Sequence, residues 1–128
     1  MRVYIAGPMT GVEGYAENFR RAEKFISANG DVPINPVEMS MLLGSTEMGF
    51  RTMYFVDDGE IAEESLTRVE SRECSIARAT VKAELAVLET CDAIYLLDGW
   101  EQSRGAKKEL AHAIGRGLDV YPERKAVQ

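Results

Sequence analysis

The stretch SRGAKKELAHA, residues 103–113, places a glutamate, Glu109, four residues after Gly105 and six after Ser103. It follows an apolar run, DAIYLLDGW, and its residue types favour a helix. A carboxylate in such a helix is either ordinary surface charge or a group that does chemistry. A positioned carboxylate can attack an electron-poor carbon as a nucleophile, and a second acid can protonate the leaving group.

A second glutamate, Glu84, lies in an earlier predicted helix, Ser75–Cys91. The apolar stripes of the two helices consist of Ala77, Val81, Leu85 and Leu88, and of Ala106, Leu110, Ala113 and Gly117. At about 100° per residue, each glutamate lies about 60° from the centre of its stripe, on the same side. Neither has a lysine or arginine three or four residues away, which weakens the surface ion-pair interpretation without removing it.

The elements that must position these glutamates alternate along the chain. We predict strands at Arg2–Gly7, Asp31–Pro36, Asp92–Trp100 and Leu118–Pro122, and helices at Ala16–Asn29, Ser75–Cys91 and Arg104–Gly117. Apolar strands separated by helices indicate parallel strands joined by right-handed crossovers. The 128 residues therefore predict one α/β domain with a parallel sheet of four to five strands, order 2-1-3-4, flanked by helices.

Residues 37–73 are too long for a plain crossover and are treated as an unplaced insertion. They contain a methionine-rich stretch, MSMLLGSTEMGFRTMYF, followed by an acidic one, VDDGEIAEESLTRVESRE. Asp57 or Asp58 fits the cap of a helix that runs to about Arg72. A lid, an oligomer contact, or a surface elaboration packed by its own methionines would each explain this segment.

Composition excludes several classes of protein. A net charge of −6 argues against non-specific binding of duplex nucleic acid, but it leaves room for a small anionic ligand at a helix start. Two cysteines and one histidine make a zinc site improbable, and we expect no metal or cofactor. The sequence opens directly on a strand, without a signal peptide or an apolar run of transmembrane length. These features predict a cytoplasmic protein with no membrane partner.

Ligands of parallel sheets bind at the carboxyl ends of the strands. The predicted strands end in Gly7-Pro8-Met9, in Asn35 and in Asp98-Gly99-Trp100. Glycines at such ends let backbone N–H groups approach a ligand, although a tight turn is the simpler explanation. A dinucleotide fingerprint of the type G-x-G-x-x-G is absent from the sequence. We predict that Gly7, Asn35, Gly99 and Ser103 surround one crevice.

Four segments together resemble the nucleoside 2-deoxyribosyltransferase superfamily, above all its small, often phage-encoded branch. They are YIAGPMTG, ENF, VPINP and CDAIYLLDGWEQSRGAKKELAHAIGRGLDV, and the resemblance covers residues 2–35 and 84–121. The resemblance implies a Rossmann-like parallel sheet between helices, in agreement with the alternation described above. It also implies a homodimer or larger assembly, because the superfamily completes its sites across subunits.

The resemblance implies roles for individual residues. Glu109 matches the catalytic nucleophile, four residues after a glycine that here is Gly105. Glu84 stands where the superfamily usually has a second acid, an aspartate, and its longer side chain is a departure. Ser103 stands where transferases have aspartate and where nucleoside 5′-monophosphate N-glycosidases have a serine that helps hold the 5′-phosphate. Arg104 would add charge there, and a plain helix cap is the alternative for Ser103.

The C-terminal YPERKAVQ contains no clear counterpart of the carboxylate or carboxamide that transferases lend to a neighbouring subunit. Asp98 is a candidate contact to a ribose hydroxyl, and Trp100 either stacks on a base or covers the sheet edge. Tyr4, inside a strand, is expected to be core, and His112 is expected to face solvent.

The sequence thus predicts a protein whose partner is a small-molecule nucleoside or nucleotide. The leading hypothesis is an N-glycosidase or 2-deoxyribosyltransferase that cleaves the N-glycosidic bond of a (deoxy)nucleoside 5′-monophosphate. One alternative is a protein that binds or sequesters a nucleotide or nucleotide-derived signal without cleaving it. The other is an interaction module built around residues 37–73.

Overall fold

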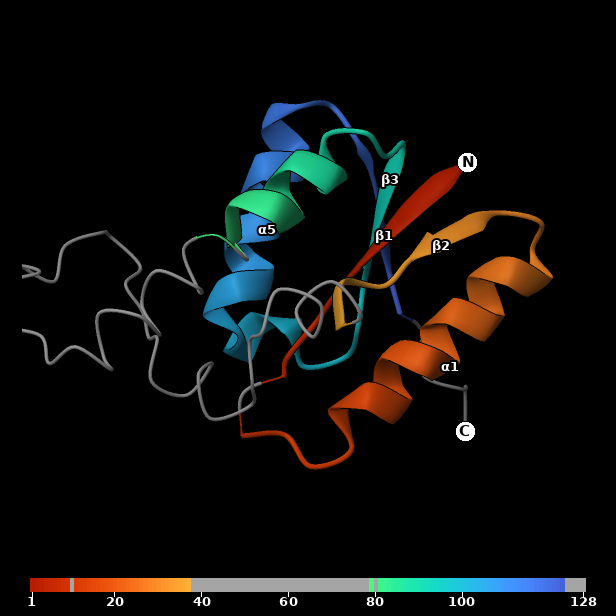
Figure 1. Ribbon diagram of the computed structural model, residues 1–128, viewed down its shortest axis with the longest axis vertical. Helices are drawn as coiled ribbons and strands as arrows, with labels where there is room; N and C mark the ends of the chain where they lie inside the picture. The colour runs from red at the N-terminus through yellow and green to blue at the C-terminus, as the bar shows by residue number, and fades with distance from the viewer. Residues whose placement is uncertain (10, 38–78, 80, 124–128) are drawn as a thin grey trace, which may run out of the picture.

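The computed structural model describes residues 1–9, 11–37, 79 and 81–123 (Figure 1). Four strands are present in this part: β1 (Arg2–Ala6), β2 (Val32–Ile34), β3 (Ala93–Leu96) and β4 (Asp119–Pro122). The helices are α1 (Tyr15–Ala28), α5 (Arg104–Gly115), the short 3-10 helix η2 (Trp100–Gln102), and a helix over residues 81–88. The predictions for residues 38–73, including the helix capped by Asp57 or Asp58, lie outside the described residues.

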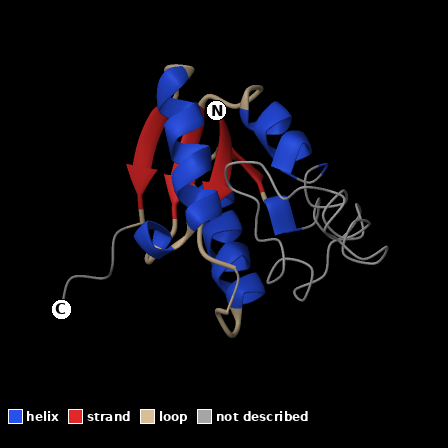
Figure 2. Ribbon diagram, turned by 90° about the vertical axis from the view of Figure 1, so that its left-hand side faces the viewer, coloured by secondary structure: helices blue, strands red, loops and turns tan. Residues whose placement is uncertain are grey.

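The four strands form one sheet in the order β2-β1-β3-β4, and every neighbouring pair is parallel. The predicted fold class and strand order are therefore confirmed. Figure 2 shows the strand arrows running in the same direction behind the helices. The chain leaves β1 toward β2 but leaves β3 toward β4, so the direction of strand addition reverses between β1 and β3. Ligands of open α/β sheets bind at this kind of reversal.

The helices lie on both faces of the sheet (Figure 1). Because crossovers are right-handed, the β1-to-β2 and β3-to-β4 connections run in opposite directions and place α1 and α5 on opposite faces. Two core clusters result. The cluster under α1 contains Val3, Ile5, Phe19, Ala22, Ile26, Val37, Ala93, Tyr95 and Leu97. The cluster under α5 and residues 81–88 contains Tyr4, Ala6, Leu88, Cys91, Ile94, Leu96, Ala106 and Ala113.

The third strand is shorter than the sequence predicted. It ends at Leu96 rather than Trp100, because Gly99 has a φ of 87° and starts a tight turn. Trp100 then lies in η2, which was not expected from the sequence. The shortened strand leaves a connection of a few residues between the carboxyl end of β3 and the start of α5.

Candidate active site

Two carboxylates are buried on the α5 face of the sheet. Glu84 is 7% exposed and Glu109 is 9% exposed, and within the described residues these are the buried charged side chains. Glu109 projects from α5 beside the buried Ala106 and Ala113, and Glu84 precedes the buried Leu88 by one helical turn. Their offset from the apolar stripes therefore carries both carboxyl groups inward rather than into water.

Tyr4 joins this pair from the sheet. It lies in the middle of β1, is fully buried, and its hydroxyl donates a hydrogen bond to Oε2 of Glu109. The expectation that Tyr4 belongs to the core is confirmed, but sequence reasoning missed its contact with the acid. One available signal was the hydroxyl itself, because a buried tyrosine in an otherwise apolar strand needs a hydrogen-bond partner.

Burial dominates the electrostatics of the three groups. It raises the pKa of Glu109 well above the ordinary value, the nearby charge of Glu84 raises it further, and the hydrogen bond from Tyr4 partly offsets both. Burial is also the largest cause that raises the pKa of Tyr4, and the charges of Glu109 and Glu84 raise it further. Tyr4 is therefore a hydrogen-bond donor at any ordinary pH, and Glu109 favours its protonated form.

A carboxyl pair of this kind can divide the work of acid and nucleophile. Two like charges in a low-dielectric site repel, so the pair gains by keeping one proton between its two members. The ionised member can attack a carbon while the protonated one gives its proton to a leaving group. No lysine or arginine among the described residues forms an ion pair with Glu109, so nothing there neutralises its charge permanently.

Ser103 starts the helix that carries Glu109. Its backbone is extended, with φ −107° and ψ 119°, and its Oγ accepts the Ala106 N–H at 3.1 Å. The Ser103 carbonyl accepts the Lys107 N–H at 3.0 Å and so opens the helical ladder. The N-cap interpretation is confirmed. The hydroxyl proton of Ser103 stays available for a further acceptor, and the first backbone N–H groups of α5, at Arg104 and Gly105, precede that ladder.

The loops that follow β1 and β3 touch each other at the carboxyl edge of the sheet. A Cβ atom on Gly7 would lie 2.6 Å from Cβ of Leu97, so only glycine fits there. A Cβ on Gly99 would lie 3.5 Å from Cγ of Pro8. The loops that carry Gly7 and Gly99, two of the four residues predicted to surround one crevice, are therefore neighbours at the reversal between β1 and β3.

The remaining predicted residues divide between the two faces. Met9 packs against the core cluster under α1, and the exposed Asp98 borders a groove on the same face. Trp100 packs against the cluster under α5, which is the face of the acid pair. Asn35 is held by its own neighbours, because its amide donates to Glu23 at 2.8 Å and its side-chain oxygen accepts the Val37 N–H at 3.0 Å.

His112 keeps 29% of its side chain exposed, but it also contacts a residue that follows the neighbouring helix. Its Nε2 lies 2.9 Å from Oε1 of Glu89, and the same oxygen accepts a hydrogen bond from Nη2 of Arg116 at 2.7 Å. This cluster links α5 to the end of the helix over residues 81–88. It therefore connects the two helices that carry Glu109 and Glu84.

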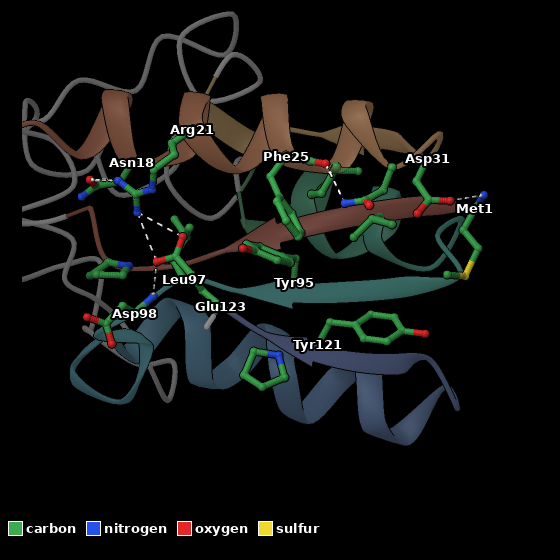
Figure 3. A pocket seen from close by; sticks show the side chains of 15 residues that line it. Met1, Asn18, Arg21, Phe25, Asp31, Tyr95, Leu97, Asp98, Tyr121 and Glu123 are labelled. Atoms are coloured by element: carbon green, nitrogen blue, oxygen red, sulfur yellow. Dashed lines mark hydrogen bonds and ion pairs between the residues drawn. The ribbon is translucent and has the colours of Figure 1, made fainter. Parts of the chain in front are cut away.

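The groove on the α1 face has a volume of about 1190 Å³ (Figure 3). Phe25, Tyr95 and Tyr121 line its middle, and the ring centroids of Phe25 and Tyr95 lie 5.8 Å apart. Arg21 and Glu123 line one end. Neither Glu84 nor Glu109 contributes to it, so this groove is separate from the acid pair.

Fold and site together define a Rossmann-like α/β domain with two buried acids on one face of its sheet, one of which accepts a hydrogen bond from Tyr4. The chain belongs to the family described as "Domain of unknown function (DUF4406)", whose family model matches residues 1–121. Neither the curated proteins nor the solved structures contain a match to the chain. No helix within the described ranges is long and apolar enough to cross a bilayer.

Proposed function

We propose that this protein cleaves the N-glycosidic bond of a (deoxy)nucleoside 5′-monophosphate, with Glu109 as the nucleophile and Glu84 as the second acid. The observation that carries the proposal is the hydrogen bond from Tyr4 to a buried Glu109 beside a second buried carboxyl. The resemblance of the chain to nucleoside 2-deoxyribosyltransferases points to the same residue.

The chemistry follows from the arrangement of the three groups. Tyr4 engages Oε2 of Glu109, which leaves Oε1 to attack C1′ of the sugar. As the new C1′–O bond forms, the bond from C1′ to the base nitrogen breaks, and its electron pair stays on the base. In the reacting form of the pair Glu109 is ionised and Glu84 is protonated, and Glu84 delivers its proton to the departing base.

The second step decides between hydrolysis and transfer. Glu84, now ionised, takes a proton from water as the water oxygen attacks C1′, which releases the sugar phosphate and restores Glu109. A second base in place of water gives transfer of the sugar. Hydrolysis and transfer share every step up to the formation of the covalent glycosyl-enzyme.

The preference for a monophosphate is supported by the start of α5. Ser103 caps this helix and still has a hydroxyl proton to donate, and the backbone N–H groups beside it favour an anion. An aspartate at this position would cap equally well but would repel a phosphate. We also propose that the protein is a dimer or larger, which light scattering over a range of concentrations tests.

The experiment is an incubation of the protein with a panel of nucleosides and their 5′-monophosphates, followed by chromatography for free base. Release of base from one or more monophosphates supports the proposal. Measurable binding of a monophosphate without base release would instead support the sequestering alternative.

A further inference from the structure

Glu123, directly after β4, holds three parts of the fold together (Figure 3). Its side chain is only 12% exposed. Both carboxylate oxygens accept from Nη2 of Arg21, at 3.1 and 3.0 Å, and Oε1 also accepts the backbone N–H of Asp98 at 3.2 Å. Its own backbone N–H donates to the Leu96 carbonyl at 2.7 Å. One carboxylate thus connects α1, the end of β4 and the connection that follows β3.

Arg21 is also held by a hydrogen bond to a residue of its own helix. Its Nη1 donates to Oδ1 of Asn18 at 3.1 Å, one turn earlier on α1. Exposed ion pairs usually contribute little to the stability of a fold, because both side chains lose conformational freedom and water screens the charges. The Glu123 carboxylate is different, since it is largely removed from water and accepts from both a guanidinium and a backbone N–H.

The connection held by this carboxylate leads to Ser103 at the start of α5, where the 5′-phosphate is proposed to bind. It runs from Leu97 through Asp98, Gly99 and η2 to Ser103. Its backbone hydrogen bonds are mostly internal, from Trp100 to Leu97, from Gln102 to Gly99 and from Ser103 to Trp100. An external bond, from the Leu97 N–H to the Ala6 carbonyl at 2.8 Å, lies at its very start. The Asp98 N–H to Glu123 bond is the next attachment along the chain.

We propose that Glu123, held by Arg21, is a positioning residue that keeps residues 97–103 in the geometry needed for substrate. This inference rests on the proposed function for its substrate, a nucleoside 5′-monophosphate. Without the Glu123 carboxylate, the Asp98 N–H loses its acceptor and the glycine turn at Gly99 gains freedom. Ser103 would then occupy a wider range of positions at the start of α5.

Trp100 reports on this segment directly, because it is the one tryptophan of the chain and lies in η2. The first measurement is acrylamide quenching of its fluorescence in wild type, Glu123→Ala and Arg21→Ala. We expect greater quenching in both variants and a wild-type far-ultraviolet circular dichroism spectrum. Glu123→Gln, which keeps an acceptor for the Asp98 N–H, should restore most of the protection. Arg20→Ala is the matched control, since Arg20 pairs with Glu17 on the same helix and not with Glu123.

The second measurement is the kinetics of base release. Glu123→Ala should raise KM about tenfold with little change in kcat. The variant loses the hydrogen bond from the Asp98 N–H, so residues 97–103 move more freely and bind the substrate more weakly. Glu123→Gln should recover most of that loss. Because Glu123→Ala removes a largely buried group, Arg21→Ala, an exposed residue, provides the same test if the first variant does not fold.

Quenching equal to wild type in folded Glu123→Ala or Arg21→Ala would overturn the positioning role. Increased quenching with an unchanged KM would also overturn it, because the segment would then move without consequence for substrate. If the wild-type protein neither cleaves nor binds a monophosphate, the proposed function fails, and the link to substrate fails with it. Quenching then still decides whether Glu123 orders residues 97–103.

Discussion

The hydroxyl of Tyr4 donates a hydrogen bond to Glu109 although the two residues lie 105 positions apart in the sequence. One comes from the first strand and the other from the helix that leads into the last strand. The bond connects the middle of β1 to α5 and engages Oε2 of Glu109. In the proposed reaction the other oxygen, Oε1, attacks the substrate.

Replacing Tyr4 by phenylalanine should keep the packing but remove this donor. The hydrogen bond lowers the pKa of Glu109, so its loss should raise that pKa further. The rise of base release with increasing pH should therefore shift to higher pH, and the rate at pH 7 should fall by about tenfold or more. Tyr121→Phe is the control, because Tyr121 is exposed on β4 and its hydroxyl lies 3.5 Å from Oδ2 of Asp119, away from Glu109. An unchanged pH profile in Tyr4→Phe would show that the bond does not tune Glu109.

The pH dependence of folding tests the same electrostatics without a substrate. The pKa of Glu109 is raised by burial in the folded state, so the folded protein holds a proton that the unfolded chain releases. The stabilisation from this group is complete below the ordinary glutamate pKa and is lost as pH rises through the raised value. Glu109→Gln, which resembles the protonated acid, should therefore unfold at a higher temperature than wild type near neutral pH. That difference should shrink as pH falls toward 4, and a difference independent of pH would contradict the burial argument.

Much of the fold follows from the sequence because its signals are local. Uninterrupted apolar runs such as RVYIA predict buried parallel strands. For the order β2-β1-β3-β4, the right-handed crossover rule then places α1 and α5 on opposite faces. The helical offsets of Glu84 and Glu109 predict that both flank the buried faces of their helices, and their low exposure agrees with this. These features depend on periodicity, which a single sequence displays.

Other features depend on distances between remote segments. The contact of Tyr4 with Glu109 and that of Glu123 with Arg21 each join residues about a hundred positions apart, and no periodicity pairs them. The early end of β3 follows from the left-handed conformation of Gly99, where a strand continuing to Trp100 was equally compatible with the apolar run. The family assignment adds no residue roles, so the roles of Glu84 and Glu109 stay predictions.

Two glycine substitutions should have opposite effects on stability. Gly7→Ala would place a Cβ 2.6 Å from Cβ of Leu97, which forces the β1 and β3 loops apart and should cost about 1–3 kcal/mol. Gly105→Ala meets only Oγ of Ser103, at 3.9 Å, within the first turn of α5, and should stabilise by roughly 0.5–1 kcal/mol. Urea unfolding of both variants measures these changes. Equal stability of Gly7→Ala and wild type would mean that the two loops do not meet as described.

Ser103→Asp separates capping from phosphate recognition. Aspartate still caps the helix, so the melting temperature should change little. Its charge repels phosphate, so the preference for a 5′-monophosphate over the parent nucleoside, expected to be at least about tenfold in wild type, should be lost or reversed. Calorimetric titration with a matched nucleoside and monophosphate measures this. Ser103→Ala, which loses the cap but adds no charge, is the control, and an unchanged preference in Ser103→Asp would leave Ser103 as a cap alone.

The most direct test of the central claim is the release of free base from a panel of nucleoside 5′-monophosphates by wild type and Glu109→Gln. Glutamine keeps an oxygen for the Tyr4 hydroxyl and nearly the same shape, but it cannot form the ester bond to C1′. We predict base release by wild type and a loss of at least about a thousandfold in folded Glu109→Gln. Equal rates in the two proteins, or no release from any substrate by wild type, would contradict the assignment of Glu109 as a glycosyl nucleophile.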